Sequence, residues 1–488
     1  MHGAPAPRAA VEPPLAGGRP HRVPGLVDAH VHLLLGGILL TRTDLRRARD
    51  RSEFEAAVAE AHARLPAGDW LVAWGWDESR LGAMPDRTWL AAAGVRPAVA
   101  WRIDQHACVV NDAVLSLLDG CACPAGGEIR TAADGRRSGV LAEAAAWELV
   151  NPRIPRPGIE QRREALLAAA QHAVAAGATT VGTMEYLEDV LQVYEPLRRR
   201  LPLRIRVTLL DREWPLDVSM AERLQGDDRL SIIGFKAFVD GTLGSRTARM
   251  LEPWSDAPES RGLLVELAAQ GVLPQWVARV VESGGSPSIH AIGDEAARVA
   301  LDAMESGDPG RHGRLEHMQT VHPEDVRRTA GRFVSIQPSH RPMDLQPALS
   351  RLGPRRMERF FPFRAMADAG AVLALGSDWP IAPLDPVATM HAAIVPPEDP
   401  AAQPAWSGCL TPAEALRAST VNARQALCAP ADEPDWTLLD ADPLTCAWRA
   451  GPPRVLATVV DGRCVHAVNE AARALADARS DARQEARS

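Results

Sequence analysis

Lys236 is the only lysine in a chain of 488 residues, in which lysine and arginine together number 54. Arginine supplies the positive charge almost everywhere, so a position that keeps lysine indicates a need for more than charge. A lysine amine can lose its proton and act as a nucleophile, whereas a guanidinium stays protonated in proteins. Such an amine can react with carbon dioxide to give a carbamate, an anionic donor that can bridge two metal ions. The count alone is equally compatible with an ordinary lysine.

Five further residues have side chains that can ligate a metal ion, and each lies in or directly after a predicted strand. His30 and His32 are two residues apart on one strand, so both side chains point to the same face. Each residue alone is as easily explained by packing or by a turn. Imidazole and carboxylate donors together suit Zn²⁺ or a related divalent ion. The sequence therefore predicts a centre of one or two metal ions with these ligands: His30, His32, Lys236, His290, His317 and Asp378.

The elements that would position these residues form a β/α repeat. Eight short apolar runs end in polar residues and are separated by helical stretches such as 159–176, 295–306 and 362–370, so we predict an α/β fold, a (β/α)₈ TIM barrel built from residues 25–48 and 159–430. In such a barrel the active site lies at the carboxyl ends of the strands. The predicted strands are 25–31, 178–184, 203–210, 231–239, 286–292, 313–318, 332–338 and 371–377.

Three other regions do not fit the repeat. Residues 49–158 are rich in tryptophan and fall between the first two strands, so they are predicted to form an inserted lobe. Residues 1–24 and 431–466 are assigned to a small β domain, and 467–488 to a solvated helix or frayed tail. Because no clear strand is visible before residue 25, we expect an incomplete β-sandwich or a sequence that starts internally.

Composition limits the partners. The formal net charge is -8 and the arginines are scattered, which argues against a nucleic-acid or membrane partner and favours a small-molecule substrate. The seven cysteines include no CxxC pair, which favours a reducing, cytoplasmic location. The longest apolar stretch is shorter than the roughly 20 residues that cross a bilayer. The composition is compatible with a homodimer as well as with a monomer.

Several segments resemble motifs of the amidohydrolase superfamily, in particular of its YtcJ-like branch, which includes N-substituted formamide deformylases. The segments are PGLVDAHVHL, GFKAFVDGTLGSRTA, IHAIGDEA, RLEHMQ, SIQPSH followed by Asp344, and LGSDWPIAPLDP. The resemblance implies that His30 and His32 bind one metal ion and that a carboxylated Lys236 bridges it to a second. His290 and His317 are the implied ligands of that second ion.

The resemblance also implies hydrolysis of a C–N bond other than a peptide bond, in an amide, N-formyl or N-acyl group of a small molecule. A divalent metal lowers the pKa of bound water toward neutrality, so that hydroxide is available. Asp378 is the implied catalytic residue, which takes a proton from this water and passes it to the leaving nitrogen. A metal-dependent lyase or isomerase on the same barrel is the alternative, and a catalytically silent binding protein is a third. The complete ligand set and the presence of Asp378 favour hydrolysis.

Four residues are predicted to contact the substrate. Arg246 and His340 lie past strand ends on the catalytic side. Trp76 and Trp379 would provide an apolar wall for an aryl or alkyl group, although core packing explains Trp76 equally well.

Residues near the ligands could orient them. Asp240, Asp294 and Glu316 are each close in sequence to a ligand, and each is equally well explained as a turn or solvated acid. His106 in the inserted lobe is a weaker candidate, since a packed histidine fits as well. Gln105 occupies the position at which the family usually has glycine, which predicts an altered pocket entrance.

Overall fold

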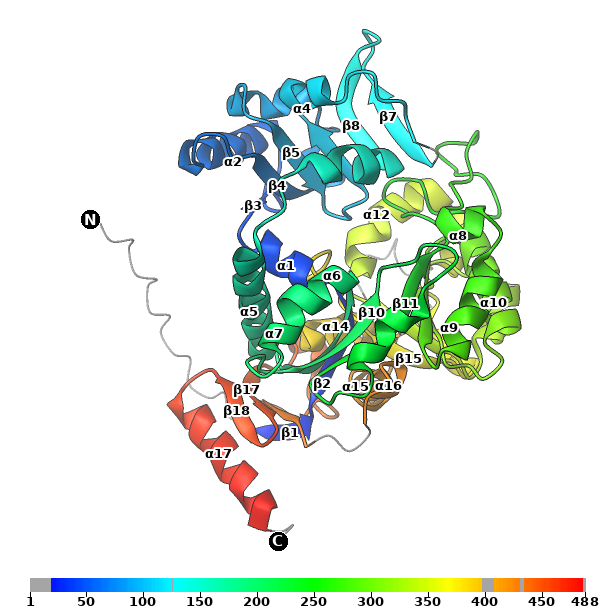
Figure 1. Cartoon of the computed structure of the whole chain (residues 1–488). Helices are drawn as coiled ribbons and strands as arrows, with labels where there is room; N and C mark the ends of the chain where they lie inside the picture. The colour runs from blue at the N-terminus through cyan, green and yellow to red at the C-terminus, as the bar shows by residue number, and fades with distance from the viewer. Residues whose placement is uncertain (1–18, 125, 397–407, 431–433, 486–488) are drawn as a thin grey trace, which may run out of the picture.

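The computed structural model describes residues 19–124, 126–396, 408–430 and 434–485. These residues form a barrel with a second sheet above it and a small third sheet below it (Figure 1). No helix in these ranges is both long enough and apolar enough to cross a bilayer.

The central sheet consists of eight parallel strands in the order β15-β14-β13-β12-β11-β10-β9-β2, and all eight strand predictions are confirmed. Backbone hydrogen bonds close the barrel between its two end strands: His32 donates to the Trp379 carbonyl and Asp378 to the His30 carbonyl, both at 2.7 Å. Closure therefore brings Asp378 beside the paired histidines of the first strand. The strands are β2 (Leu26–Val31), β9 (Ala178–Glu185), β10 (Arg204–Leu209), β11 (Leu230–Phe238), β12 (Ser286–Ala291), β13 (Arg314–His317), β14 (Phe333–Ile336) and β15 (Val372–Leu375).

Helices cover the outside of the barrel (Figure 1). In α5 (Ile159–Ala175) the buried residues recur at helical spacing, and the helix packs closely on α1 (Leu33–Leu39). A Cβ at Gly37 would lie 2.2 Å from the Ala165 carbonyl oxygen, so this approach requires glycine. The other helices are α6 (Leu187–Asp189), α7 (Glu195–Leu197), α8 (Glu266–Ala269), α9 (Leu273–Glu282), α10 (Asp294–Gly307), α11 (Pro323–Val326), α12 (His340–Leu352), α13 (Phe363–Asp368), α14 (Pro386–Ile394), α15 (Pro412–Ala418) and α16 (Val421–Ala426).

The inserted lobe contains a mixed six-stranded sheet that begins before residue 49, where the lobe was predicted to start. Trp74 and Trp76 fill separate apolar cores on the two sides of the sheet, because a bulge at Gly75, whose φ is +94°, shifts the register of β4 against β5 between them. The strands, in sheet order, are β3 (Thr43–Asp44), β4 (Leu71–Trp76), β5 (Ala98–Arg102), β6 (Ala107–Val110), β8 (Arg137–Glu143) and β7 (Gly127–Thr131), with helices α2 (Arg51–Arg64), α3 (Glu78–Leu81) and α4 (Asp112–Leu117).

The small third sheet corrects one expectation. A strand does precede residue 25, because β1 (His21–Pro24) pairs antiparallel with β16 (Trp436–Leu439). Beyond β17 (Val455–Val460) and β18 (Arg463–Ala467), the chain forms α17 (Glu470–Glu485), the helix of the two alternatives predicted there, and its buried alanines pack against this sheet. Single-sequence periodicity missed β1 because a four-residue edge strand carries too few positions to show a pattern.

Candidate metal centre

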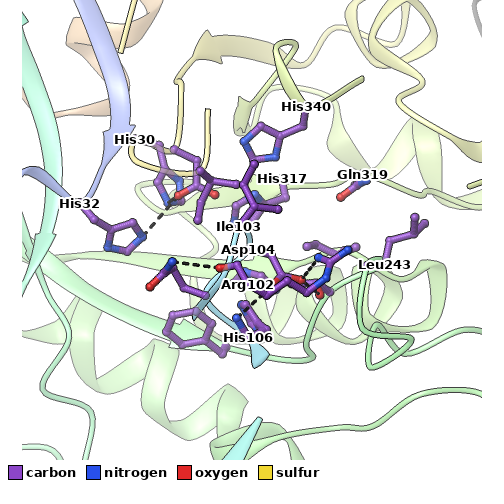
Figure 2. A pocket seen from close by; sticks show the side chains of 18 of the residues that line it. His30, His32, Arg102, Ile103, Asp104, His106, Leu243, His317, Gln319 and His340 are labelled. Carbon is purple, nitrogen blue, oxygen red and sulfur yellow. Dashed lines mark hydrogen bonds and ion pairs between the residues drawn. The ribbon is translucent and has the colours of Figure 1, made fainter. Parts of the chain in front are cut away.

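The six predicted ligands line one cavity of about 480 Å³ between the barrel and the lobe. Figure 2 shows three of them, His30, His32 and His317, in this cavity. The six come from the carboxyl ends of five barrel strands, as the topology requires. Five of the six are buried, and His32 is partly exposed.

The four imidazoles form a continuous row. The ring centroids of His30 and His317 are 5.0 Å apart, and those of His317 and His290 are 4.5 Å apart. His32 extends the row at 5.7 Å from His30. Burial lowers the pKa of His290 and His317 well below its usual value, aided by the neighbouring charges. Both imidazoles are therefore neutral, which is the form that binds metal ions.

Hydrogen bonds fix which ring nitrogen of each histidine faces the cavity. His30 Nδ1 lies 2.8 Å from a Glu316 carboxylate oxygen, so Nδ1 donates and Nε2 remains available. His290 Nε2 donates to the Gly241 carbonyl at 3.1 Å, which leaves Nδ1 available. Although burial opposes the charged form of Glu316, the Arg314 guanidinium and His30 hold its pKa well below the usual range. The available nitrogens are thus set by residues outside the donor set.

Asp378 is held beside the first two histidines. One of its carboxylate oxygens lies 3.4 Å from His30 Nε2 and 3.4 Å from His32 Nε2. Burial opposes its negative charge, but these imidazoles lower its pKa below the ordinary value. Its backbone φ is +58°, a conformation that non-glycine residues seldom adopt and that aims the side chain into the cavity.

Lys236 is buried and lines the same cavity. Its amine forms no hydrogen bond or ion pair with any residue that the structure describes, and lies 5.2 Å from the centre of the Phe238 ring. Burial lowers its pKa to about 8, despite the opposing charges of Glu316 and Asp378. A buried amine without a partner is costly unless something else in the site satisfies it.

The donor set fits a divalent metal ion. Ligand atoms of His30, His317 and Asp378 all lie within 4.8 Å of one another, and all three residues are buried. The remaining imidazoles and the isolated amine of Lys236 line the same space. Nitrogen and oxygen donors in this arrangement match the preferences of Zn²⁺ and related ions.

Two of the three acids expected to orient ligands lie where they could do so. Glu316 bonds to His30 as described, and Asp240 lies 3.6 Å from His290 Nε2 while it accepts three backbone N–H bonds, from Arg249, Ile292 and Gly293. Asp294, by contrast, binds the Leu251 N–H and the Arg359 guanidinium and contacts no candidate ligand.

Only one of the four predicted substrate residues lines the cavity. His340 does, with Nε2 donating to the Ser377 carbonyl at 3.2 Å. Arg246 is instead paired with Asp256 at 2.7 Å outside the cavity. Trp76 is buried in the lobe core and donates to the Ala100 carbonyl. Trp379 is buried in the barrel core and stacks on His172. The assignments of Arg246, Trp76 and Trp379 to the pocket wall are therefore wrong, because ion pairing and core packing turn the three side chains away.

The lobe closes one side of the cavity with residues that the sequence only hinted at. Arg102, Asp104, Gln105, His106 and Trp147 all line it. Gln105 has a φ of +60°, a left-handed conformation that glycine adopts without strain and that other residues seldom adopt.

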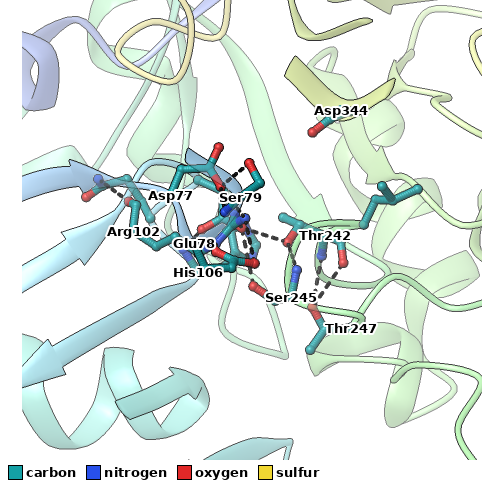
Figure 3. Close-up of polar contacts among 12 residues, drawn as sticks. Asp77, Glu78, Ser79, Arg102, His106, Thr242, Ser245, Thr247 and Asp344 are labelled. Carbon is teal, nitrogen blue, oxygen red and sulfur yellow. Dashed lines mark hydrogen bonds and ion pairs between the residues drawn. The ribbon is translucent and has the colours of Figure 1, made fainter. Parts of the chain in front are cut away.

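Figure 3 shows the polar contacts that dock the lobe on the barrel loop after β11. One Asp104 oxygen accepts hydrogen bonds from Arg102, Thr242 and Ser245, at 2.6, 3.0 and 3.3 Å. In the sequence, Thr242 and Ser245 were marked by the GTLGSRTA stretch to which they belong, whereas no motif marked Asp104. On the barrel side, Gln319 donates to Asp344 at 2.7 Å, and both line the cavity. These two were visible only as members of the RLEHMQ and SIQPSH motifs.

Comparison with known proteins identifies the family. The model of the amidohydrolase family matches residues 21–466. The chain belongs to this family of hydrolases. Among its relatives, Protein LONG AFTER FAR-RED 3 of Arabidopsis thaliana is 31% identical over 440 residues, covering 83% of this chain and 74% of the relative. A Bacillus subtilis (strain 168) protein that carries the name amidohydrolase YtcJ is 31% identical over 391 residues, covering 76% of this chain and 73% of that protein.

Solved structures share the whole architecture. A crystal structure of an uncharacterized metal-dependent hydrolase from Pyrococcus horikoshii OT3 is 27% identical with a TM-score of 0.71 and covers 88% of both chains. One from Pyrococcus furiosus, also an uncharacterized metal-dependent hydrolase, is 26% identical with a TM-score of 0.66, covering 87% of this chain and 88% of that one. The fold is thus shared with these proteins over most of the chain.

Proposed function

We propose that this protein is a metal-dependent hydrolase that cleaves a C–N bond other than a peptide bond, in an amide, N-formyl or N-acyl group of a small molecule. The observation that carries the proposal is the convergence of four imidazoles, one carboxylate and an isolated buried amine in one cavity. Membership of the amidohydrolase family and the likeness to structures described as metal-dependent hydrolases support hydrolysis.

The proposed cofactor is Zn²⁺, as one or two ions, with carbon dioxide bound as a carbamate on Lys236. His30 and His32 would hold one ion and His290 and His317 the other, with the carbamate between them. When bound, the metal would polarise the scissile carbonyl and make water a stronger acid. A carbamate would also convert the otherwise isolated amine of Lys236 into an anionic group suited to the metal ions.

The protein's own residues supply proton transfer and orientation. Asp378 is ionised, faces the cavity and is held by two imidazoles, so it can accept a proton from the attacking water and return it to the leaving nitrogen. Gln319, Asp344 and His340 offer hydrogen bonds on the barrel side of the cavity. The volume of about 480 Å³ suits a small molecule better than a folded polypeptide.

We also propose a cytoplasmic location and a small molecule as the principal partner, with no nucleic acid or membrane. All seven cysteines are free, which fits a reducing compartment.

Metal analysis combined with a substrate panel tests the proposal. The protein is purified without chelators, its metal content is measured, and it is assayed against N-formyl and N-acyl amines. Metal together with release of amine and acid is the expected result. Metal with decarboxylation or isomerisation, and no hydrolysis, would replace the proposal with the lyase or isomerase alternative. Absence of both metal and turnover would leave a binding protein.

A further inference from the structure

His106 is brought to the cavity by the inserted lobe, at one end of the row of imidazoles. Its ring centroid lies 6.2 Å from that of His290, with the rings nearly parallel at 27°. Asp378 contacts His30 and His32 at the other end of the row. A reacting group bound in the cavity between them would therefore have Asp378 on one side and His106 on the other.

The Nδ1 atom of His106 is committed to a buried carboxylate. It lies 2.9 Å from one Glu143 oxygen, and the other Glu143 oxygen accepts a short hydrogen bond from the Thr247 hydroxyl. No described residue forms a hydrogen bond with Nε2 of His106, although the residue lines the cavity. A histidine that serves packing alone usually has both nitrogens satisfied when buried. Here Nε2 is the atom left for a molecule in the cavity.

The surroundings hold this ring in place at the expense of backbone strain. Gln105 and Glu143 have φ values of +60° and +50°, which are unfavourable for residues with a Cβ and recur at functional sites. Trp147 packs edge-on against the ring, with centroids 4.8 Å apart, and donates to the Gln105 carbonyl.

The loop that binds Glu143 also contacts a candidate metal ligand. Gly241 accepts the hydrogen bond from His290, and a Cβ at Gly241 would lie 2.1 Å from Thr247 Oγ1 and 2.7 Å from a Glu143 oxygen. The absence of a side chain at Gly241 therefore lets the lobe carboxylate approach the barrel this closely. One short loop thus sets the position of His290 and of the Glu143–His106 pair together.

We infer that His106 is a catalytic residue, which hydrogen-bonds through Nε2 to the reacting amide of the substrate, with Glu143 as its positioning residue. This inference rests on the proposed hydrolase function and extends it: the active site is complete only when the lobe is docked on the barrel. The ligand class is a small amide bound between His106 and Asp378.

Two substitutions of His106 test the roles of the two ring nitrogens separately. The amide nitrogen of asparagine can take the place of Nδ1, so His106→Asn retains the bond to Glu143 and removes only Nε2. Glutamine reaches further, so His106→Gln replaces Nε2 and gives up the bond to Glu143. The lobe's other histidine, His62, accepts from Arg96 away from the cavity, and His62→Asn is the matched control.

The experiment measures kcat/KM on the best substrate of the panel, together with metal content and melting temperature. His106→Asn is expected to lose about 100-fold in kcat/KM with unchanged metal and melting temperature, which is the size of a lost proton-transfer or hydrogen-bonding group. His106→Gln is expected to have a kcat/KM about tenfold higher than that of His106→Asn, in spite of a lower melting temperature. His62→Asn is expected to match the wild type.

The other outcomes overturn the inference. Wild-type kcat/KM in His106→Asn would show that Nε2 contacts nothing that reacts. Loss of metal or unfolding in His106→Asn would make His106 a structural residue. No hydrolysis by the metal-loaded wild type would overturn the proposed function and this inference together, whereas active wild type with active His106→Asn overturns this inference alone.

Discussion

The two sides of the cavity are built in different ways. On the barrel side, the ligands lie at the ends of parallel strands, and the sheet itself brings them together. On the lobe side, Asp104 and His106 lie in the turn between β5 and β6, and side-chain hydrogen bonds to a distant loop hold this turn at the cavity. The barrel side therefore follows from backbone topology, while the lobe side depends on a few long-range polar contacts. Disruption of the barrel side should abolish the chemistry, and disruption of the lobe side should weaken it.

The largest expected effect is on the barrel side, at Lys236. Lys236→Arg retains a positive charge but cannot form a carbamate, so metal content and activity should both fall, with a loss in kcat/KM of about a thousandfold or more. Metal analysis and circular dichroism on the same sample check the result. If the folded variant kept its full metal content, the proposed carbamate on Lys236 would be wrong. Part of the contrast between the barrel side and the lobe side of the cavity would then disappear.

The next largest effect concerns Glu185, at the end of β9 beneath the first pair of histidines. Its buried carboxylate accepts hydrogen bonds from the Leu34 N–H and from the hydroxyls of Thr183 and Tyr194, yet burial raises its pKa to about 7 from 4.5. Because the folded state holds the proton more tightly, its contribution to stability is present below pH 4.5 and is lost as pH rises through about 7.

The corresponding variant is Glu185→Gln, which cannot titrate. Relative to the wild type, the variant should gain on the order of 3 kcal/mol in the free energy of unfolding between pH 4.5 and 8. Denaturant unfolding at several pH values, at constant metal content, measures the difference. Parallel pH profiles for the two proteins would mean that Glu185 stays ionised throughout.

On the lobe side, Asp104→Asn tests docking. The substitution removes the charge that pairs with Arg102 and weakens the bonds from Thr242 and Ser245. We expect a loss of about tenfold in kcat/KM, since the lobe residues are less firmly held against the substrate. Metal content should not change, because every candidate ligand lies on the barrel. A loss of metal in this variant would show that the two sides are not separable.

The smallest expected effect is at Trp76. Trp76→Phe removes the hydrogen bond to the Ala100 carbonyl inside the lobe core and should cost about 1 kcal/mol in the free energy of unfolding. The KM should stay at its wild-type value, because the side chain does not line the cavity. A raised KM with unchanged stability would place Trp76 at the substrate site.

Local sequence patterns were enough to predict the barrel and its candidate metal ligands. Eight apolar runs with polar ends imply parallel strands, and the period of two in a strand places His30 and His32 on one face. Strand ends in a parallel barrel meet at one rim, so spacing along the chain was enough to predict that His290, His317 and Asp378 converge.

Which polar and aromatic residues face the cavity could not be predicted in this way, because it depends on how the elements pack together. Trp76 and Trp379 are buried in cores and Arg246 is paired with Asp256, whereas Asp104 and His106 reach the site from the lobe. The contacts that hold the lobe residues at the site join residues more than 100 positions apart, such as Glu143 with Thr247. Local periodicity carries no information about such contacts, because it describes which face of an element is buried and not what that face meets.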